Sequence, residues 1–566
     1  MKRPVLWHLA VVAVLAILTY ANSVSGAFVW DDEVQIVKNA NLRSLANIPS
    51  AFTQPFWGFA TPDAANQTNF YRPMQTVLYT LAYAWGGLDP VPGHIISIGL
   101  HTLASLLVYL ICVQLGFIPA VSLLAAALFA THPIHTEAVA WIAATPDLAC
   151  GVFYFASLLT FLKSEDGAQK KWLVLSAFLL FPALLSKEMA ITLPVIVFLL
   201  GLGRRTISQH ARILTPFAAV TAVYLAMRVN ALGFVATQHT TLSLSAADWL
   251  TLGIQVFGRY IWFALLPHPL LAYHQIPLHL EDRLVPGLIA LVAIAALAAL
   301  AWRFRARLPA AALWFAAFAI MLVPVFYFNG ISTAFMADRY LYIPSLAAVI
   351  VMACAIAAIP SRYALWIGWS IVAIFAVRSL DRNQDWKDGE TIFSKTLEQE
   401  PNIARIQLDL AKILLNRGDD VNARHHMETA LFSMDSRKYS QLPDDYYRVH
   451  IGLGAILARQ RNYPPAIEHL NAAKQADPKG EWPYLYLGGI ALEAENDIPK
   501  AIDLLQTAVR LGPINETARD YLGIAYFNQG RVQEAKTEFE QALKINPTHA
   551  EARQHLEMAT RAQVQP

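Results

Sequence analysis

Apolar residues dominate the chain up to about residue 380, in long runs separated by short breaks that contain charged residues, proline or glycine. Runs of this length and composition predict helices that cross a membrane. The first run precedes an acidic segment without a small-residue cleavage site, which favours a retained anchor over a signal peptide. We expect about 11 spans, at residues 5–24, 95–113, 120–130, 148–162, 172–185, 190–202, 214–232, 285–302, 309–328, 340–359 and 365–377.

Basic residues in the short loops predict the orientation, because lysine and arginine collect on the cytoplasmic side of a membrane. The run at 250–266 carries Arg259, so we treat it as interfacial. The loop residues then fall on one side: Lys2, Arg3, Lys163, Lys170, Lys171, Arg204, Arg205, Arg303, Arg305, Arg307 and Arg362. We therefore expect a multi-pass protein of the cell inner membrane, whose longer loops face the periplasm.

Beyond about residue 380 the pattern changes to amphipathic helices rich in alanine and leucine, with charges of both signs. Residues recur at the offsets of the tetratricopeptide repeat, in which small side chains let paired helices pack closely. An odd number of spans places these repeats outside the cytoplasm. The matching residues are Leu522, Gly523, Tyr526, Ala535, Phe539, Ala542 and Pro547 in the last copy, Leu453, Gly454, Ala466, Ala473 and Pro478 in an earlier copy, Gly488, Ala501, Ala508 and Pro513 in a third, and Leu410, Ala423 and Ala430 in a degenerate first copy.

Composition agrees with this division. Of 566 residues, 56% are hydrophobic and only 15% are charged, which excludes an ordinary soluble enzyme. The net charge of +2 gives no whole-chain attraction to nucleic acid. The sequence predicts an all-α protein: a polytopic helix bundle over residues 1–380, a juxtamembrane linker over 381–401 and a tetratricopeptide α-solenoid over 402–566.

Four groups of polar residues interrupt the apolar region, and the topology places all of them on the non-cytoplasmic face. Asp31 and Asp32 follow the first span, where adjacent carboxylates suit a general base or a metal, or form a solvated loop edge. Tyr71 and Arg72 precede Pro73, a residue typical of a helix start. An arginine there suits a lipid phosphate, although an interfacial anchor is an equal alternative.

The other two groups lie at breaks between apolar runs. In the first break, His132 and His135 are three residues apart and Glu137 follows, so they could hold a divalent metal or form a helix-capping turn whose histidines bind phosphate or sugar. The second group combines Ser186-Lys187-Glu188 with Asp338-Arg339-Tyr340, where the cations could bind phosphate or snorkel to the interface.

Taken in order, the segments WDDEVQIVKN, YRPMQ, GHIISIGLHTLASLLVYL, HPIHTEAVAWI, SKE, MADRYLYIPS and RNQDWKDGETIFSKTLEQEPN, followed by the repeats, resemble a known family. The chain is similar to the transmembrane-and-tetratricopeptide-repeat protein O-mannosyltransferases, including bacterial members, within the GT-C glycosyltransferases. The resemblance covers essentially the whole chain. One departure is Pro146, where the family pattern has a basic residue directly before the aspartate.

This resemblance implies that the protein moves a monosaccharide from a polyprenyl-phosphate donor to a hydroxyl, with serine or threonine of an envelope protein as the expected acceptor. It implies an acidic residue of the first external loop as the base, and we expect Asp32 in this role with Asp31 supporting it. The expected phosphate contacts are Arg72, Lys187, Arg339 and Tyr340. The expected pocket residues are Tyr71, His132, His135, Glu137 and Glu188.

A divalent metal is a possible cofactor, with Asp31, Asp32, His132, His135 and Glu137 as candidate ligands. The alternative function is a non-enzymatic scaffold whose repeats recruit an envelope partner. Convergence of Asp32, Arg72 and Lys187 on one face favours the enzyme, because a scaffold has no need of it.

Overall fold

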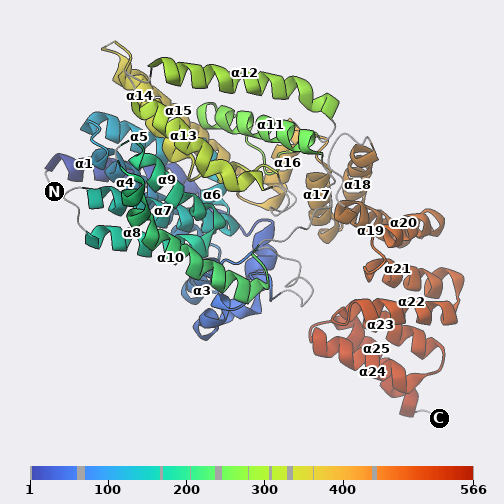
Figure 1. Ribbon diagram of the computed structural model, residues 1–566. Helices are drawn as coiled ribbons and strands as arrows, with labels where there is room; N and C mark the ends of the chain where they lie inside the picture. The colour runs from blue at the N-terminus through green and yellow to red at the C-terminus, as the bar shows by residue number, and fades with distance from the viewer. Residues whose placement is uncertain are drawn as a thin grey trace. The chain divides into compact units, whose positions relative to one another are not determined.

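The computed structural model describes residues 3–59, 70–165, 170–203, 205–235, 245–277, 280–304, 309–327, 335–360, 362–435 and 443–564. Every regular element in these ranges is helical, which confirms the predicted all-α class (Figure 1). The chain divides into two compact units, Met1–Gln399 and Glu400–Pro566.

The first unit is the apolar helix bundle. Its α-helices are α1 (Arg3–Tyr20), α3 (Pro73–Gly86), α4 (Val91–Gln114), α5 (Pro119–Thr131), α6 (Thr136–Ala140), α7 (Thr145–Glu165), α8 (Lys170–Ser186), α9 (Leu193–Gly201), α10 (Ile207–Leu232), α11 (Ala246–Leu265), α12 (Leu280–Phe304), α13 (Pro309–Leu322), α14 (Ser345–Ala357), α15 (Ala364–Asp385) and α16 (Gly389–Gln399). Short helices that matter below are η2 (Glu33–Val37), η3 (Ala40–Arg43), η4 (Leu45–Phe52), η5 (Pro133–His135), η7 (Glu188–Thr192), η8 (Val323–Phe326) and η9 (Asp338–Leu341).

Several of these helices have the length and composition of membrane spans. Within the described residues six are long and apolar enough to cross a bilayer, and four apolar helices are shorter. α7 is almost wholly buried and packs between α4 and α8, whereas α10 and α12 bury little of their surface. An apolar helix that stays exposed in the protein is satisfied by lipid, so the chain is a multi-pass membrane protein.

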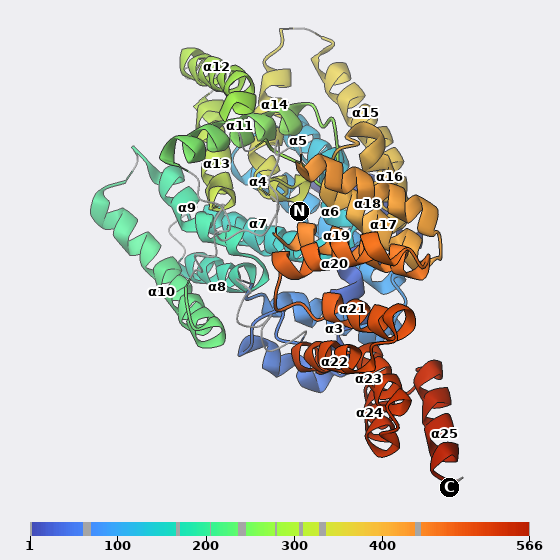
Figure 2. The same ribbon diagram turned by 90° about the vertical axis from the view of Figure 1, so that its right-hand side faces the viewer.

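The expected interfacial run at 250–266 forms the later part of α11, which is amphipathic and packs lengthwise against α12 (Figures 1 and 2). α11 is not among the six span-like helices. Of the basic loop residues, Lys2, Arg204, Arg305 and Arg307 lie outside the described residues. The orientation of the bundle stays a prediction.

Residues 381–399 of the segment expected to be a juxtamembrane linker belong to the first unit. α15 continues to Asp385, and α16 follows after three residues. The backbone amide of Ala272 donates to Oγ1 of Thr396 at 3.2 Å, and Phe393 packs edge-on against Trp30. Residues 381–399 therefore pack against the bundle, at the first loop and at the loop after α11.

The second unit consists of helix pairs in series. They are α17 (Ala404–Asn416), α18 (Asp420–Asp435), α19 (Pro443–Arg459), α20 (Tyr463–Ala476), α21 (Trp482–Ile490), α22 (Ile498–Leu511), α23 (Glu516–Asn528), α24 (Val532–Ile545) and α25 (Ala550–Val564).

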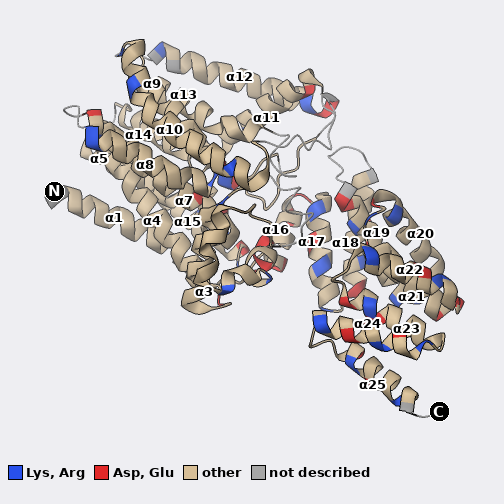
Figure 3. Cartoon of the chain, turned by 60° about the horizontal axis from the view of Figure 1, so that its bottom comes forward, with Lys and Arg blue, Asp and Glu red and all other residues tan. Residues whose placement is uncertain are grey.

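The same close contact recurs in three of these pairs. A Cβ atom added to Gly454, Gly488 or Gly523 would come within 2.7, 2.6 and 2.4 Å, respectively, of a leucine or phenylalanine of the partner helix. Only glycine permits this approach, which explains why it recurs at the predicted offset. The unit is a tetratricopeptide solenoid, and charged residues occur far more densely in its helices than in those of the bundle (Figure 3).

Candidate active site

A cavity of about 390 Å³ lies in the bundle between η7, α10, η8 and η9, beside the residues that precede α3. Its walls are mainly apolar, from Met189, Ile191, Leu225, Val235, Val323, Pro324 and Val325. Its polar residues are Arg72, Lys187, Glu188, Tyr224, Arg228, Tyr327 and Tyr340. Three cations against one carboxylate give this lining a net positive charge. The cavity thus combines an apolar volume with an anion-attracting side.

Lys187 reaches the cavity because the backbone is extended between α8 and η7. Its ammonium lies 2.5 Å from Oδ1 of Asp147, at the start of α7, and 4.8 Å from the centre of the Tyr340 ring. The side chains of this ion pair are only 6% and 8% exposed. Breaking such a buried pair leaves an uncompensated charge in a medium of low polarity. The sequence analysis missed Asp147 as this partner, although a lone aspartate in an apolar stretch is a signal for it.

Arg72 is positioned by the start of α3. Pro73 occupies the first turn and Arg72 is the N-cap residue, as the motif predicts. The guanidinium packs 4.3 Å from the ring centre of Phe70, and Nη2 donates to Oε2 of Glu188 at 3.1 Å. Arg72 also lines a small polar pocket of about 20 Å³, together with asparagine and glutamine side chains of the first loop. It therefore stands between an apolar and a polar cavity.

Arg228, which the sequence analysis missed, completes the cationic lining. It lies in α10, an otherwise largely apolar helix, and its Nη1 is 3.7 Å from Oε1 of Glu188. Its Nε donates to the carbonyl of Val235 at 2.8 Å. Glu188 thus connects two arginines from different helices. A single arginine inside an apolar span was a signal that could have identified it.

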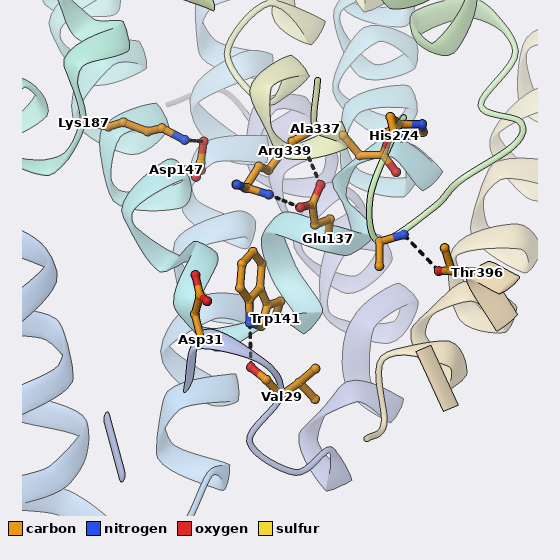
Figure 4. Close-up of polar contacts among 12 residues, drawn as sticks. Val29, Asp31, Glu137, Trp141, Asp147, Lys187, His274, Ala337, Arg339 and Thr396 are labelled. Carbon is orange, nitrogen blue, oxygen red and sulfur yellow. Dashed lines mark hydrogen bonds and ion pairs between the residues drawn. The ribbon is translucent and has the colours of Figure 1, made fainter. Parts of the chain in front are cut away.

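Arg339 and Glu137 lie beside the cavity rather than in its lining. The Arg339 guanidinium forms an ion pair with Glu137, and its backbone amide donates to the other carboxylate oxygen at 2.9 Å. It also lies 5.1 Å from the ring centres of both Trp141 and Tyr340. Figure 4 shows this pair next to Lys187 and Asp147, as one charged cluster. Glu137 therefore holds Arg339 in place and does not itself face the cavity.

The segment that carries Arg339 has a second anchor. His274, from the loop after α11, lies 2.6 Å from Asp338 through Nε2 and Oδ1, and both side chains are buried. The Tyr260 hydroxyl accepts a hydrogen bond from the amide of Ala337 at 3.2 Å. These contacts fix η9, which brings Arg339 and Tyr340 to the site. Neither contact was foreseen, because both join residues more than sixty positions apart in the chain.

The two aspartates of the first loop lie in different surroundings. Asp32 is buried, and its Oδ2 accepts a hydrogen bond from the Val29 amide at 2.9 Å, which ties its own turn together. Burial raises the pKa of the Asp32 carboxyl well above its ordinary value, while the backbone hydrogen bonds lower it in part. Asp31 is partly exposed, and in Figure 4 its carboxylate is directed past Trp141 toward the charged cluster. The structure therefore separates a buried aspartate from an accessible one.

Trp30 shapes the backbone just before this pair. Its φ is +55°, a left-handed conformation that costs a bulky residue about 1–2 kcal/mol. The indole stacks on Trp141 at 5.7 Å between ring centres, and Trp141 stacks in turn on Trp386. Nε1 of Trp141 donates to the carbonyl of Val29 at 3.0 Å. This aromatic stack holds the strained turn from which Asp31 projects.

His132 and His135 lie in the core of the bundle, away from the cavity. Nε2 of His132 is 3.0 Å from the carbonyl of Ala264, and its Nδ1 accepts from the amide of Ile134. His135 contacts the carbonyl of Phe129 at 3.0 Å and Oγ of Ser345 at 2.8 Å. All four ring nitrogens are used within the protein. The expected pocket role of these histidines is therefore corrected to a capping and packing role.

The candidate metal ligands are not brought together. Among the described residues, no group of three or more His, Cys, Asp and Glu side chains lies close enough to hold a metal ion. Glu137 is engaged by Arg339, and the two histidines are engaged by groups of the core.

Tyr71, an expected pocket residue, also lies outside the cavity lining, because its buried hydroxyl donates to the carbonyl of Phe52 at 2.8 Å. Its role is to hold the first loop against α3.

Two protein families match parts of the chain. The dolichyl-phosphate-mannose-protein mannosyltransferase family matches residues 73–231, and the tetratricopeptide repeat matches residues 517–549. The first match contains Lys187, Glu188 and Arg228 of the cavity lining. It begins one residue after Arg72.

Individual relatives extend this similarity. The mouse protein O-mannosyl-transferase TMTC3 is 26% identical over 94% of this chain and 59% of its own length. The human protein O-mannosyl-transferase TMTC4 is 34% identical over 33% of this chain and 28% of its own length. The chain thus spans less than two thirds of the length of either relative. A solved tetratricopeptide protein from Thermus thermophilus, TTC0263, covers 35% of this chain and 96% of its own at 20% identity, with a TM-score of 0.26.

Proposed function

We propose that the protein is a membrane glycosyltransferase that moves a monosaccharide from a polyprenyl-phosphate donor to serine or threonine hydroxyls of a protein. The observation that carries this proposal is the cavity, which joins apolar walls to Arg72, Lys187 and Arg228. A lipid phosphate needs this combination, because its chain must leave water while its phosphate needs cations. Similarity to protein O-mannosyl-transferases supports a hexose, and mannose first.

The cations of the larger cavity have one task in this chemistry. Arg72, Lys187 and Arg228 hold the phosphate of the donor. The acceptor oxygen attacks the anomeric carbon while the bond from that carbon to the phosphate oxygen breaks. The electron pair leaves with the lipid phosphate, whose charge the cations stabilise. The hydroxyl proton passes to a carboxylate.

We assign this carboxylate to Asp31, which reverses the order expected from the sequence. Asp32 is buried, and its Oδ2 is bound by the backbone of its own turn, so its role is to shape that turn. Asp31 is the more accessible aspartate and faces the side of Trp141 where Arg339 lies. A base must reach the proton that it removes, and geometry therefore decides between the two.

The repeats supply a protein acceptor in this proposal. Tetratricopeptide helix pairs form grooves that bind extended peptides or helices of other proteins. The acceptor proteins belong to the compartment on the non-cytoplasmic side, which in an inner membrane is the periplasm. The competing function is a scaffold that uses the same repeats without any transfer, and the assay below separates the two.

The test is sugar transfer by the purified protein in detergent. The donor is polyprenyl-phosphate mannose with a radiolabelled sugar, and the acceptors are peptides that contain serine and threonine. We expect wild type to label the peptide, Asp31→Asn to lose transfer because an amide cannot take the proton, and Arg362→Ala to match wild type. Arg362 is an exposed loop residue that donates to Tyr363, so it is a matched control for surface charge.

The outcome separates the alternatives. Full transfer by Asp31→Asn together with loss of transfer in Asp32→Asn would show that Asp32 is the base, as expected from the sequence. Absence of transfer from polyprenyl-phosphate mannose, glucose and galactose, by a protein that retains its helix content and thermal transition, would favour the scaffold.

A further inference from the structure

Beneath the two aspartates lies a buried polar network that the proposed reaction does not yet use. It consists of Gln35 from η2 and of Gln75 and Tyr79 from α3, and all three side chains are less than 7% exposed. Buried amides and hydroxyls are costly unless their hydrogen bonds are satisfied. Apolar side chains of Ile36, Phe56 and Ile142 pack around Tyr79 and keep the network enclosed.

The hydrogen bonds of this network form a closed triangle. Nε2 of Gln75 donates to Oε1 of Gln35 at 2.9 Å and to the Tyr79 hydroxyl at 2.7 Å. The Tyr79 hydroxyl donates to the same Oε1 of Gln35 at 3.2 Å. The carbonyl oxygen of Gln35 thus accepts two hydrogen bonds from α3. With its oxygen held in this way, the amide nitrogen must point to the opposite side.

That nitrogen points at the proposed base. Nε2 of Gln35 donates to Oδ2 of Asp31 at 3.3 Å, four residues earlier in the chain. Gln35 lies in η2, a π-helix, which is a rare form that recurs at functional sites, and Asp31 lies two residues before this helix. The same α3 that holds Gln35 begins directly after Arg72, the proposed phosphate contact. α3 therefore positions both the proposed base, through Gln35, and the proposed phosphate contact, Arg72.

We infer that Gln35 is a positioning residue that holds the Asp31 carboxylate in its charged form, with its amide fixed by Gln75 and Tyr79. The inference rests on the proposed function only for the role of Asp31, because the contacts themselves are independent of any activity. An amide donor favours the charged carboxylate, so its loss makes Asp31 harder to ionise. The rigid link to α3 also keeps the base at a constant distance from the phosphate contact.

The experiment measures the ionisation of Asp31 directly. Carbodiimide-activated labelling with an amine, followed by peptide mass spectrometry, reports the protonated fraction of Asp31 against pH. The variants are Gln35→Leu, Gln35→Glu and Tyr79→Phe, with Tyr83→Phe as the matched control on the same helix. Phenylalanine at residue 83 keeps the ring that packs against Arg43. The other charges near the network are Asp32, Glu33 and Lys38 on the same segment, Arg43 of η3, Arg72 before α3 and Arg339 across Trp141, and all stay unchanged.

We expect the labelling midpoint of Asp31 to rise by about one pH unit in Gln35→Leu, by more in Gln35→Glu and by less in Tyr79→Phe. Tyr83→Phe should match wild type. The acid limb of the pH–rate profile for transfer should move in the same order. Gln35→Glu preserves the size and polarity of the side chain, so it still tests the inference if Gln35→Leu fails to fold.

An unchanged midpoint in both Gln35 variants would overturn the inference, whatever the transfer assay shows. Conversely, shifted midpoints together with full transfer by Asp31→Asn would leave the positioning contact intact. That result would remove Asp31 from the catalytic role instead.

Discussion

One ion pair of the bundle and one of the repeat unit lie in opposite surroundings. In the bundle, Lys187 and Asp147 are 6% and 8% exposed, whereas in the repeats Arg424 and Glu428 are 42% and 51% exposed. An exposed pair contributes little to stability, since water already solvates both charges. A buried pair survives only where its geometry or its function requires it. A buried charged residue in the apolar bundle is therefore a better indicator of a functional site than an exposed charged residue in the polar repeat unit.

The first prediction concerns the buried ion pair of the bundle. Asp147→Ala should destabilise the bundle by about 3–5 kcal/mol, because it leaves Lys187 buried and unpaired. Glu428→Ala, the matched change in the repeats, should not change stability measurably. Thermal unfolding in detergent measures both.

A double variant then separates stability from function. Asp147→Leu with Lys187→Met should recover most of the lost stability, since both charges are gone. It should nevertheless stay inactive, because the donor phosphate has lost a cation. Recovery of transfer in this variant would mean that the pair is purely structural.

The second prediction concerns the cationic lining. Arg72→Ala should lower kcat/KM about 100-fold, the range observed when one stabilising donor is removed from a reaction centre. Arg228→Ala should have a smaller effect, because its guanidinium is farther from Glu188 and is also held by Val235. Steady-state transfer with a labelled donor measures both. Equal activity of wild type and Arg72→Ala would show that the donor phosphate does not bind in this cavity.

The third prediction tests the second unit. Deleting residues 402–566 should leave transfer to a small alcohol intact but lower transfer to protein at least tenfold. The bundle is a compact unit that ends at Gln399, so the cut lies beyond its helices. Both acceptors are compared with the same donor. Equal loss on both would show that the repeats stabilise the bundle, and undiminished protein transfer would rule out acceptor binding.

The fourth prediction has the smallest effect and concerns Asp32. Burial raises the pKa of this carboxyl in the folded protein, so the folded state binds its proton more tightly than the unfolded state. The stability that this proton contributes is present below the unfolded value of about 4 and is lost as the pH rises through the folded value. Asp32→Asn should therefore gain stability relative to wild type as the pH increases. A difference in Tm that is independent of pH between about pH 5 and about pH 8 would contradict this.

Much of the site could be predicted because ionisable residues are costly in apolar runs. Arg72, Lys187, Glu188 and Tyr340 come from three separate parts of the sequence, and the structure brings them to one cavity. Topology predicted that these residues share one face of the bundle, but it did not decide which residues of that face reach the cavity. The repeats were predictable for a different reason, because a glycine that touches the partner helix recurs at a fixed offset.

The remaining residues could not be predicted because burial is decided by packing. His132 and His135 have the spacing of metal ligands, yet backbone groups and the Ser345 hydroxyl take up their ring nitrogens. Which of Asp31 and Asp32 is accessible depends on a strained turn at Trp30, whose stacking partner Trp141 is more than a hundred residues away. No local pattern encodes such a contact.

The proposed function depends on a lipid phosphate held at the cationic side of the cavity. Cryo-electron microscopy of the full-length protein with added polyprenyl phosphate tests it most directly. We expect density for the phosphate within hydrogen-bond distance of Arg72 and Lys187, with the lipid chain along the apolar walls from α10 and η8. Saturable binding with the phosphate elsewhere, and this cavity without lipid density, would contradict the account.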